Sequence, residues 1–226
     1  MDVHVNAAMS VDGKLATVSR KQLRISGPND FDRVDELRAR VDAVMVGVGT
    51  VLADDPSLTV DSQSRIRGRQ QRGDPEQPTR IVADSRARTP TGSRIVNDEA
   101  DTVLLVSDAA SAEQVTRLEA HGCGIYQAGT ERVAIADCFS QLEADGIESI
   151  LVEGGGELIF SLFEAELVDR LSLFLGPLII GGESAPTLAD GTGFADADAF
   201  PQLKKQSVEE LDNGVLLEWD VSYPDV

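Results

Sequence analysis

The chain has 226 residues, 42% of them hydrophobic, which is enough for one sizeable core. Acids outnumber bases by 39 to 20, giving a formal net charge of −19, and this argues against nucleic acid as a general partner, because phosphate contacts need a basic surface. No apolar run reaches membrane-spanning length and no basic, apolar leader opens the sequence, so we expect a cytoplasmic protein without a membrane partner.

The cysteines and histidines give no sign of a disulfide framework or a metal site. Cys123 and Cys138 are the only cysteines, and they have neither the CxxC spacing nor the nearby histidine pair of a zinc site. We interpret both as small core residues. His4 falls in an expected strand and His121 near the end of an expected helix, and we interpret both as structural.

Apolar spacing predicts strands that alternate with helices along most of the chain. Strands are predicted at 3–8, 43–48, 79–83, 102–106, 124–126 and 149–152, and then at 171–175, 178–180 and 215–221. Helices are predicted at 31–41 behind a cap at Asn29 or Asp30, in a short segment before Pro56, and at 115–121, 134–144 and 158–167.

This order of elements predicts an α/β fold with a mainly parallel sheet, flanking helices and an antiparallel edge formed by the C-terminal strands. We expect a single domain over 1–226. Residues 61–78 carry four arginines and show neither a helix nor a strand period, which predicts an exposed loop or insertion.

Polar residues and glycines follow the predicted strands, where an α/β sheet binds its ligands. The most concentrated run is Glu153 followed by the glycines 154–156, placed between a buried strand and a helix. Such a turn lets backbone N–H groups approach a phosphate, although a tight turn that merely needs positive φ explains the glycines equally well. The residues that follow strands in this way are Ser10, Asp12, Gly49, Thr50, Asp54, Asp84, Ser85, Glu153 and Gly154.

Together these stretches resemble the riboflavin-biosynthesis pyrimidine reductases, and the resemblance covers nearly the whole chain. No deaminase zinc segment precedes it, so the chain is similar to the stand-alone archaeal members and not to the fused bacterial deaminase-reductases. The matching stretches are MSVDGK at 9–14, GTVLADDPSLTV at 49–60, VADS at 82–85, VEGGG at 152–156 and GGESAPT at 181–187.

The resemblance implies a dihydrofolate-reductase-like fold, a homodimer, NADPH as cofactor (NADH is an alternative) and no metal. The implied reaction reduces the ribosyl group of 2,5-diamino-6-ribosylamino-pyrimidinone 5′-phosphate to the ribityl form. The deaminated form of this substrate, dihydrofolate, and a nucleotide-binding module without catalysis remain as alternatives.

The resemblance also assigns roles to single residues. Arg38, Leu58 and Glu153 are the expected substrate contacts, and Asp54, Glu153 or Lys14 is the expected proton donor. Arg88 is added for its charge near the adenosine end and not by a motif match. The expected cofactor contacts are Thr50, Asp54, Asp84, Ser85, Arg88, Gly129, Gly154, Gly155, Gly156 and Glu157.

One departure from the bacterial pattern bears on the substrate phosphate. Asp61 stands where those relatives place a phosphate-binding arginine. Lys14, Arg38 or the arginines at 65–72 are possible substitutes.

The dispersed acid predicts a salt-dependent stability, as in a protein from a salt-filled cytoplasm. Like charges repel in the folded state, and salt shortens the screening length from about 10 Å at 0.1 M to about 3 Å at 1 M. We expect the unfolding temperature to rise steeply as KCl approaches molar concentration, measured by thermal denaturation at pH 7. An unfolding temperature that stays flat over this range would contradict the hypothesis.

Overall fold

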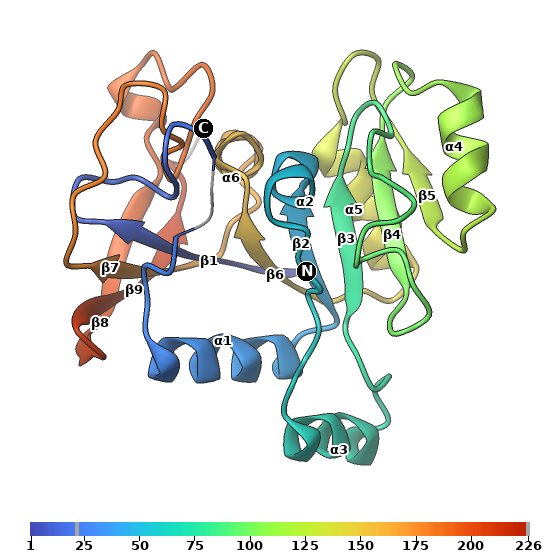
Figure 1. Cartoon of the computed structure of the whole chain (residues 1–226). Helices are drawn as coiled ribbons and strands as arrows, with labels where there is room; N and C mark the ends of the chain where they lie inside the picture. Colours follow the sequence, from blue (N-terminus) through green and yellow to red (C-terminus); the bar gives the residue numbers. More distant parts are fainter. Residues whose placement is uncertain (21–22, 225–226) are drawn as a thin grey trace. The chain divides into compact units, whose positions relative to one another are not determined.

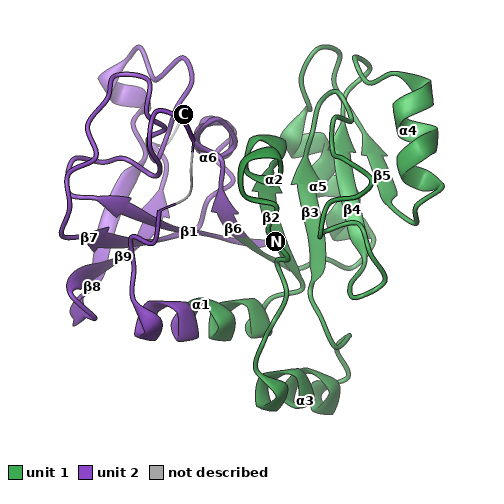
Figure 2. Cartoon of the chain, viewed as in Figure 1, with its two compact units in different colours: residues 1, 34–151 green, residues 2–33, 152–226 purple. Residues whose placement is uncertain are grey.

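The computed structural model describes residues 1–20 and 23–224, and the chain divides into two compact units (Figure 2). Unit 1 comprises Met1 and Val34–Leu151, and unit 2 comprises Asp2–Arg33 and Val152–Val226. Helix α1 (Pro28–Arg40) and strand β6 (Ser149–Gly154) each contribute residues to both units. The expectation of a single domain stays a prediction.

Unit 1 is built on four parallel strands in the order β5-β4-β3-β2 (Figure 1). The apolar runs of β2, β3 and β4 are buried on both faces, as in parallel sheets covered by helices, whereas β5 at the edge is partly exposed. The strands are β2 (Ala43–Gly47), β3 (Thr79–Ala83), β4 (Thr102–Val106) and β5 (Gly124–Gln127), and the helices are α2 (Val48–Asp54), α3 (Gln63–Arg72), α4 (Ala112–Glu119) and α5 (Ile135–Ala144).

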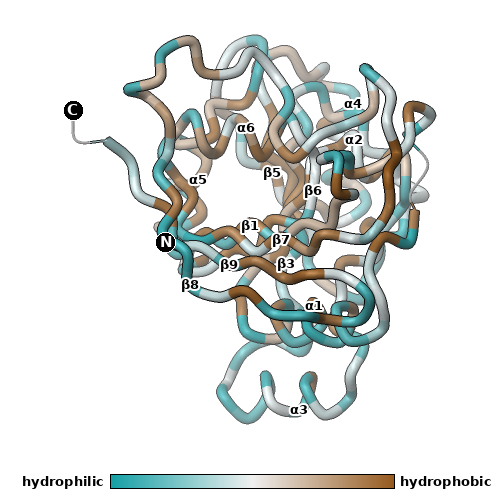
Figure 3. The backbone as a smooth tube through the Cα atoms, turned by 90° about the vertical axis from the view of Figure 1, so that its left-hand side faces the viewer, coloured by the Kyte–Doolittle hydropathy of each residue, from teal (hydrophilic) through white to brown (hydrophobic). Residues whose placement is uncertain are grey.

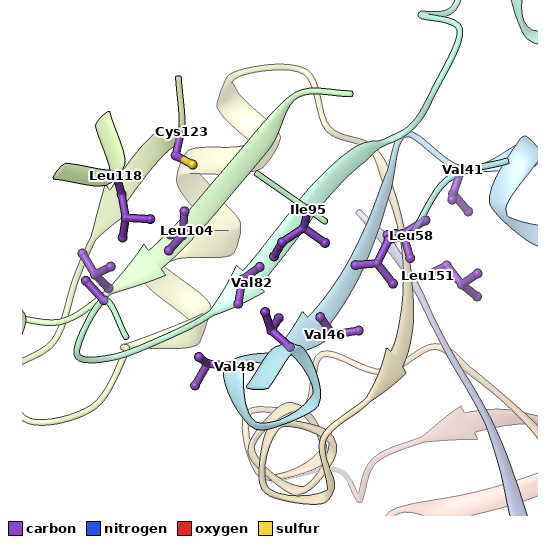
Figure 4. Close-up of a cluster of buried hydrophobic side chains, with 14 residues drawn as sticks. Val41, Val46, Val48, Leu58, Val82, Ile95, Leu104, Leu118, Cys123 and Leu151 are labelled. Atoms are coloured by element: carbon purple, nitrogen blue, oxygen red, sulfur yellow. The ribbon is translucent and has the colours of Figure 1, made fainter. Parts of the chain in front are cut away.

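The core of unit 1 gathers valines, leucines and isoleucines from these strands and the segments between them (Figure 4). Val46, Val82 and Leu104, from three neighbouring strands, are at most 1% exposed. Cys123 also belongs to this cluster, and Cys138 is fully buried in α5, so the interpretation of both cysteines as core residues is confirmed.

Unit 2 carries the antiparallel edge. Strand β1 (Asp2–Ser10) pairs in parallel with β7 (Arg170–Gly176), whereas β9 (Gly214–Ser222) pairs antiparallel with both β7 and β8 (Gln202–Leu211). Helix α6 (Gly156–Glu164) follows β6, and the short helix η1 (Ala197–Ala199) precedes β8. The predicted α/β class with an antiparallel C-terminal edge is therefore confirmed.

Near the C-terminus, one predicted strand is absent and one observed strand was not predicted. The strand expected at 178–180 is wrong: β7 ends at Gly176, and the amides of Ile180 and Gly181 bind the carboxylate of Asp12 in place of a neighbouring strand. Strand β8 has no counterpart among the predictions. Most of its residues are exposed on both faces, so its sequence lacks the alternation that marks a half-buried strand.

The cap predicted at Asn29 or Asp30 is wrong, because a distant acid caps the N-terminus of α1. The amides of Asn29 and Asp30 donate to the two carboxylate oxygens of Asp212, in the turn between β8 and β9, at 3.2 and 3.0 Å. A carboxylate at this end of a helix also interacts favourably with the helix dipole. Gly27 must be a glycine, because its Cβ would lie 2.4 Å from Cγ of Asp212.

The opposite end of α1 explains why residues 61–78 are not the predicted loop. They contain helix α3, whose Arg69 is 1% exposed and donates to the carbonyls of Ala39 and Val41 at the end of α1. Arg72 adds a bond to the carbonyl of Ala39. Figure 3 shows how hydrophilic α3 is, so tertiary bonds fix a helix that has no apolar stripe.

His4 lies in a buried polar row across the sheet of unit 2. Its Nε2 is 2.6 Å from the hydroxyl of Ser172, and Ser172 in turn donates to Glu218 on β9. Burial, assisted by Arg170 and Arg33, lowers the pKa of His4 to about 4. The imidazole is therefore neutral in the folded protein at pH 7, in keeping with a structural role.

This lowered pKa predicts a loss of stability in acid. Between pH 6.5 and about 4 the unfolded chain binds a proton at His4 that the folded chain excludes, so the free energy of unfolding falls as the pH falls through this window. The loss amounts to roughly 3 kcal/mol. Urea denaturation at several pH values checks this.

The variant His4→Gln keeps a hydrogen-bonding group but cannot titrate, so its stability should depend less on pH in this window. His121→Gln is the matched control, because His121 is exposed and its imidazole Nδ1 bonds to the carbonyl of Arg117. Equal pH slopes for the native chain and His4→Gln would refute the assignment.

Candidate functional site

The residues singled out by sequence fall on both units, and each unit's set is described by itself. In unit 1, Thr50 and Asp54 lie one turn apart on α2, which starts where β2 ends. This spacing puts the two side chains on one face of the helix. Oδ1 of Asp54 is buried without a hydrogen-bond partner, and burial raises the pKa of this carboxyl group.

Asp84 is fully buried and organises the turn after β3. Its Oδ2 accepts from the amide and the hydroxyl of Thr89 at 2.7 and 2.8 Å, and Arg88 lies 3.8 Å from Oδ1. The structure thus gives Asp84 a role inside the protein, and its contact with a cofactor stays a prediction. The side chain of Arg88 is 55% exposed, which leaves it accessible to an anion.

Backbone and hydroxyl bonds join the loops that follow β3, β4 and β5. The carbonyl of Ser85 accepts from the amide and hydroxyl of Ser107, and the hydroxyl of Ser85 accepts from the amide of Val133. The carbonyl of Gly129 accepts from the amide of Asp108 at 2.9 Å. The predicted cofactor residues Ser85 and Gly129 therefore share one edge, at the carboxyl ends of parallel strands.

Gly129 has its own steric reason to be glycine. Its φ is +88°, and a Cβ would lie 2.2 Å from the carbonyl oxygen of Arg132. A role in cofactor binding is not needed to explain this glycine.

Two expected substrate residues also serve the fold. The guanidinium of Arg38 donates to the carbonyl of Thr59 at 2.9 Å. Leu58 is 1% exposed and belongs to the core, and its φ of +56° is unusual for a side chain with Cβ. Any contact of Leu58 with a ligand therefore has to come from its backbone.

The arginines considered for the substrate phosphate are largely engaged with protein groups. Arg65 pairs with Asp35 at 2.8 Å, and the same carboxylate accepts the amides of Asp61 and Ser62. Arg69 is buried against the carbonyls of α1. A cleft of about 330 Å³ lies along this surface, lined by Glu36, Ala39, Arg40, Arg65, Gly68 and Arg72.

In unit 2 the glycine run begins α6. Gly155 is the N-cap residue with a φ of +99°, which favours glycine, and it has no side chain to cap the helix. Gly156, the first helical residue, is packed too closely for a side chain, because a Cβ would lie 2.5 Å from the carbonyl oxygen of Thr187 and from Oδ2 of Asp190. Gly154 is buried, Glu153 is half-buried at the end of β6, and Glu157 is exposed.

Lys14 belongs to a pair of bonded loops in unit 2. Its Nζ donates to the carbonyl of Ala185 at 3.3 Å, and Lys14 bridges to Thr187. Asp12 accepts from the hydroxyl of Ser10 and from two amides at 180–181, which lowers its pKa to about 2. The segments MSVDGK and GGESAPT, far apart in sequence, are thus held together.

Sequence reasoning missed Asp35, Thr187 and Asp190 as organising residues. Asp190 lies four positions beyond Pro186 in a segment with no helix or strand period, and only its spacing of three from Thr187 hints at a side-chain turn. Asp35 looks like any acid on the polar side of a helix.

The described residues contain no group of three or more His, Cys, Asp or Glu side chains arranged to hold a metal. Among residues 1–20 and 23–224, every helix falls short of the length and apolar content needed to cross a membrane.

Comparison with known proteins places the chain in a family. The model of the RibD C-terminal domain matches residues 2–217. The 2,5-diamino-6-ribosylamino-4(3H)-pyrimidinone 5′-phosphate reductase of Archaeoglobus fulgidus is 45% identical over 210 residues, which cover 93% of this chain and 92% of that protein. The reductase of the same name from Methanothermobacter thermautotrophicus is 42% identical over 220 residues, covering 97% of each chain.

Solved structures share the fold. A pyrimidine reductase-like protein from Corynebacterium diphtheriae has a TM-score of 0.84 at 21% identity, covering 98% of this chain and 92% of that one. The Saccharomyces riboflavin biosynthesis reductase Rib7 has a TM-score of 0.70 at 20% identity, covering 98% and 90%. The predicted dihydrofolate-reductase-like fold is confirmed by this likeness. The chain therefore belongs to the RibD C-terminal domain family of riboflavin-biosynthesis reductases, and it is an oxidoreductase.

Proposed function

We propose that the protein reduces the ribosyl side chain of 2,5-diamino-6-ribosylamino-pyrimidinone 5′-phosphate to the ribityl form, with NADPH as reductant. The substrate named for the two archaeal relatives supports this choice. Within the structure, the observation that carries the chemistry is Asp54, whose buried Oδ1 lacks a partner. An unpartnered buried carboxyl oxygen is costly for a fold, so a role with a ligand explains its presence.

The residues present suit a nicotinamide dinucleotide. The first turn of α6 starts at glycines and offers backbone N–H groups to an anion, and Arg88 stands exposed near the end of β3. A bound cofactor would supply the hydride. We assign the pyrophosphate contacts to Gly154, Gly155, Gly156 and Glu157, and the remaining contacts to Thr50, Asp54, Ser85, Arg88 and Gly129, with Asp84 holding the turn behind Ser85.

Reduction also needs one proton, and we assign it to Asp54. Burial disfavours the charged carboxylate and raises the pKa of Asp54, so its carboxyl group holds a proton more readily than an exposed acid. Glu153 accepts hydrogen bonds from the amino groups of the pyrimidine, and Lys14 is the alternative proton donor. Arg38 contributes positive charge on the substrate side.

The variant Asp54→Asn tests this assignment. It keeps the shape of the side chain but cannot donate an acidic proton, so we expect turnover to fall about 100-fold while NADPH affinity changes much less. Decay of NADPH absorbance in concentrated KCl measures turnover, and isothermal titration measures binding.

Asp55→Asn is the matched control for this variant. Asp55 ends α2 in a left-handed conformation that asparagine tolerates, and its carboxylate accepts from the amide of Arg94. Equal turnover in Asp54→Asn and Asp55→Asn would remove Asp54 from the proton pathway.

The same assay decides between the candidate functions. Oxidation of NADPH with the ribosylamino substrate supports the proposal, and a faster reaction with its deaminated form or with dihydrofolate would replace the substrate. Binding of NADPH without any oxidation would favour a nucleotide-binding module. Replacing NADPH by NADH in the assay shows the cofactor preference.

We propose further that the protein is a homodimer that associates through one face of the β8–β9 hairpin. Cross-strand neighbours share a face of a sheet, and the register pairs Leu203 with Val221 and Val208 with Leu217. Leu203 is 46% and Val208 58% exposed. The apolar members of this face are Leu203, Val208, Val215, Leu217, Trp219 and Val221.

Charge and backbone geometry both favour association through this face. On β8, Lys204 and Lys205 balance Glu209 and Glu210, so this strand carries no formal net charge and repels a second acidic copy less than the rest of the surface does. The register shifts between Lys205 and Ser207, and a bulge of this kind discourages pairing through the strand edge.

The variant Val208→Glu should convert the dimer to a monomer, because it places a charge in the apolar face. Gln202→Glu is the control, because Gln202 pairs with Ser222 and points to the opposite face. Sedimentation velocity in concentrated KCl measures the mass. A native chain that sediments as a monomer would contradict the proposal, as would a Val208→Glu variant that remains dimeric.

A further inference from the structure

One short segment of unit 2 touches two parts of the proposed machinery. We define the strap as residues 185–190, which lie in the long connection between β7 and β8, where η1 is the only helix or strand that the described residues form. One end of the strap binds Lys14, and the other end binds Gly156. Because this connection has little regular structure, side-chain bonds have to fix its geometry.

The Lys14 end of the strap is held like a short strand. Nζ of Lys14 donates to the carbonyl of Ala185 at 3.3 Å, and the amide of Leu15 donates to the carbonyl of Pro186 at 2.9 Å. Lys14 also forms an antiparallel bridge with Thr187. The ammonium group of Lys14 is therefore placed by the strap as well as by its own loop.

The other end of the strap lies against the start of α6. The amide of Asp190 donates to the carbonyl of Gly156 at 3.1 Å. The carbonyl of Thr187 and Oδ2 of Asp190 fill the space that a side chain at Gly156 would need. The strap therefore fixes the position of Gly156, the first residue of α6.

Asp190 closes the strap on itself. Its Oδ1 accepts from the amide of Thr187 at 3.1 Å and from the hydroxyl of Thr187 at 2.5 Å. Removing this carboxylate frees both donors of Thr187, the residue that bridges Lys14 and crowds Gly156.

We propose that the strap sets the positions of Lys14 and of the α6 glycine turn together, with Asp190 as its positioning residue. This inference rests on the proposed function, because it predicts that disturbing the strap lowers both turnover and NADPH affinity. Hydride transfer requires close contact between donor and acceptor, and a misplacement of about 1 Å can cost on the order of 100-fold in rate.

The test compares Asp190→Ala, Asp190→Asn and the matched control Asp196→Ala. Asp196 lies in the same connection, outside the strap, and its carboxylate accepts from the amide of Asp198 in a similar local turn. NADPH affinity is measured by isothermal titration without substrate, turnover by NADPH absorbance, and the unfolding temperature of each variant by thermal denaturation.

We expect Asp190→Ala to weaken NADPH binding roughly tenfold and to lower kcat roughly tenfold, with KM for the pyrimidine changed less. Asp190→Asn should recover most of both losses, because an amide oxygen can still accept from Thr187. If Asp190→Ala does not fold, Thr187→Val, which removes only the hydroxyl bond, should show both effects at smaller size, and Thr187→Ser should show neither.

Two results would overturn the inference. The first is an Asp190→Ala variant that matches Asp196→Ala in NADPH affinity and kcat, with at most a lower unfolding temperature. The second is an Asp190→Asn variant as impaired as Asp190→Ala, since the charge and not the bonded turn would then matter. If the native chain binds NADPH but does not turn over, the proposed function fails, while the affinity arm still tests the strap.

Discussion

At each end of helix α1, a charged side chain from a distant part of the chain binds the free backbone groups. In unit 2 the carboxylate of Asp212 binds the first free amides of the helix, and in unit 1 the guanidinium of Arg69 binds its last free carbonyls. Each end of a helix leaves four backbone groups unpaired, and the helix dipole favours an acid at the start and a base at the end. Both preferences are met by residues that a local view of the sequence would place on the surface.

These contacts fix more than the helix itself. The turn between β8 and β9 is tied to α1 through Asp212, so Gly27 must leave room for that carboxylate. At the other end, α3 is ordered by what its arginines bind, because it carries almost no apolar surface. Asp35 on α1 completes the link by binding Arg65 and the amides of residues 61 and 62.

The parts of the fold that sequence could predict are those that burial explains. The strands β2 and β4 are mostly apolar, β3 is apolar after Arg80, and all three lie within a residue of the predicted bounds. The misses at α3 and 178–180 share a different cause. Their conformations depend on bonds to residues far away in sequence, namely the carbonyls of α1 and Asp12, and local periodicity carries no information about such partners. Strand β8 was missed because it is exposed on both faces and shows no alternation.

The candidate site divides in the same way. Motif positions such as Thr50, Asp54 and Ser85 follow parallel strands, so their location at the strand ends was predictable. The role of each side chain was not predictable, because a carboxylate whose oxygens accept hydrogen bonds from the protein and one with an unbonded oxygen look alike in sequence. Both acids have a buried Oδ1 without a hydrogen-bond partner, but Oδ2 of Asp84 accepts two bonds from Thr89, and Arg88 lies 3.8 Å from its Oδ1. Asp54 is therefore the stronger candidate for a ligand contact.

The acidic composition makes the use of arginine inside this protein informative. Arg69 and Arg80 are almost fully buried, and both bind backbone carbonyls where acids would be the ordinary partners. Burial lowers the pKa of both guanidinium groups, yet arginine has so high a starting value that it keeps its charge. A lysine could not span several carbonyls with a planar fork. In a chain with so many acids at its surface, neutral carbonyl partners also make these two arginines less sensitive to salt than exposed ion pairs, because screening acts on exposed charge pairs far more than on buried hydrogen bonds.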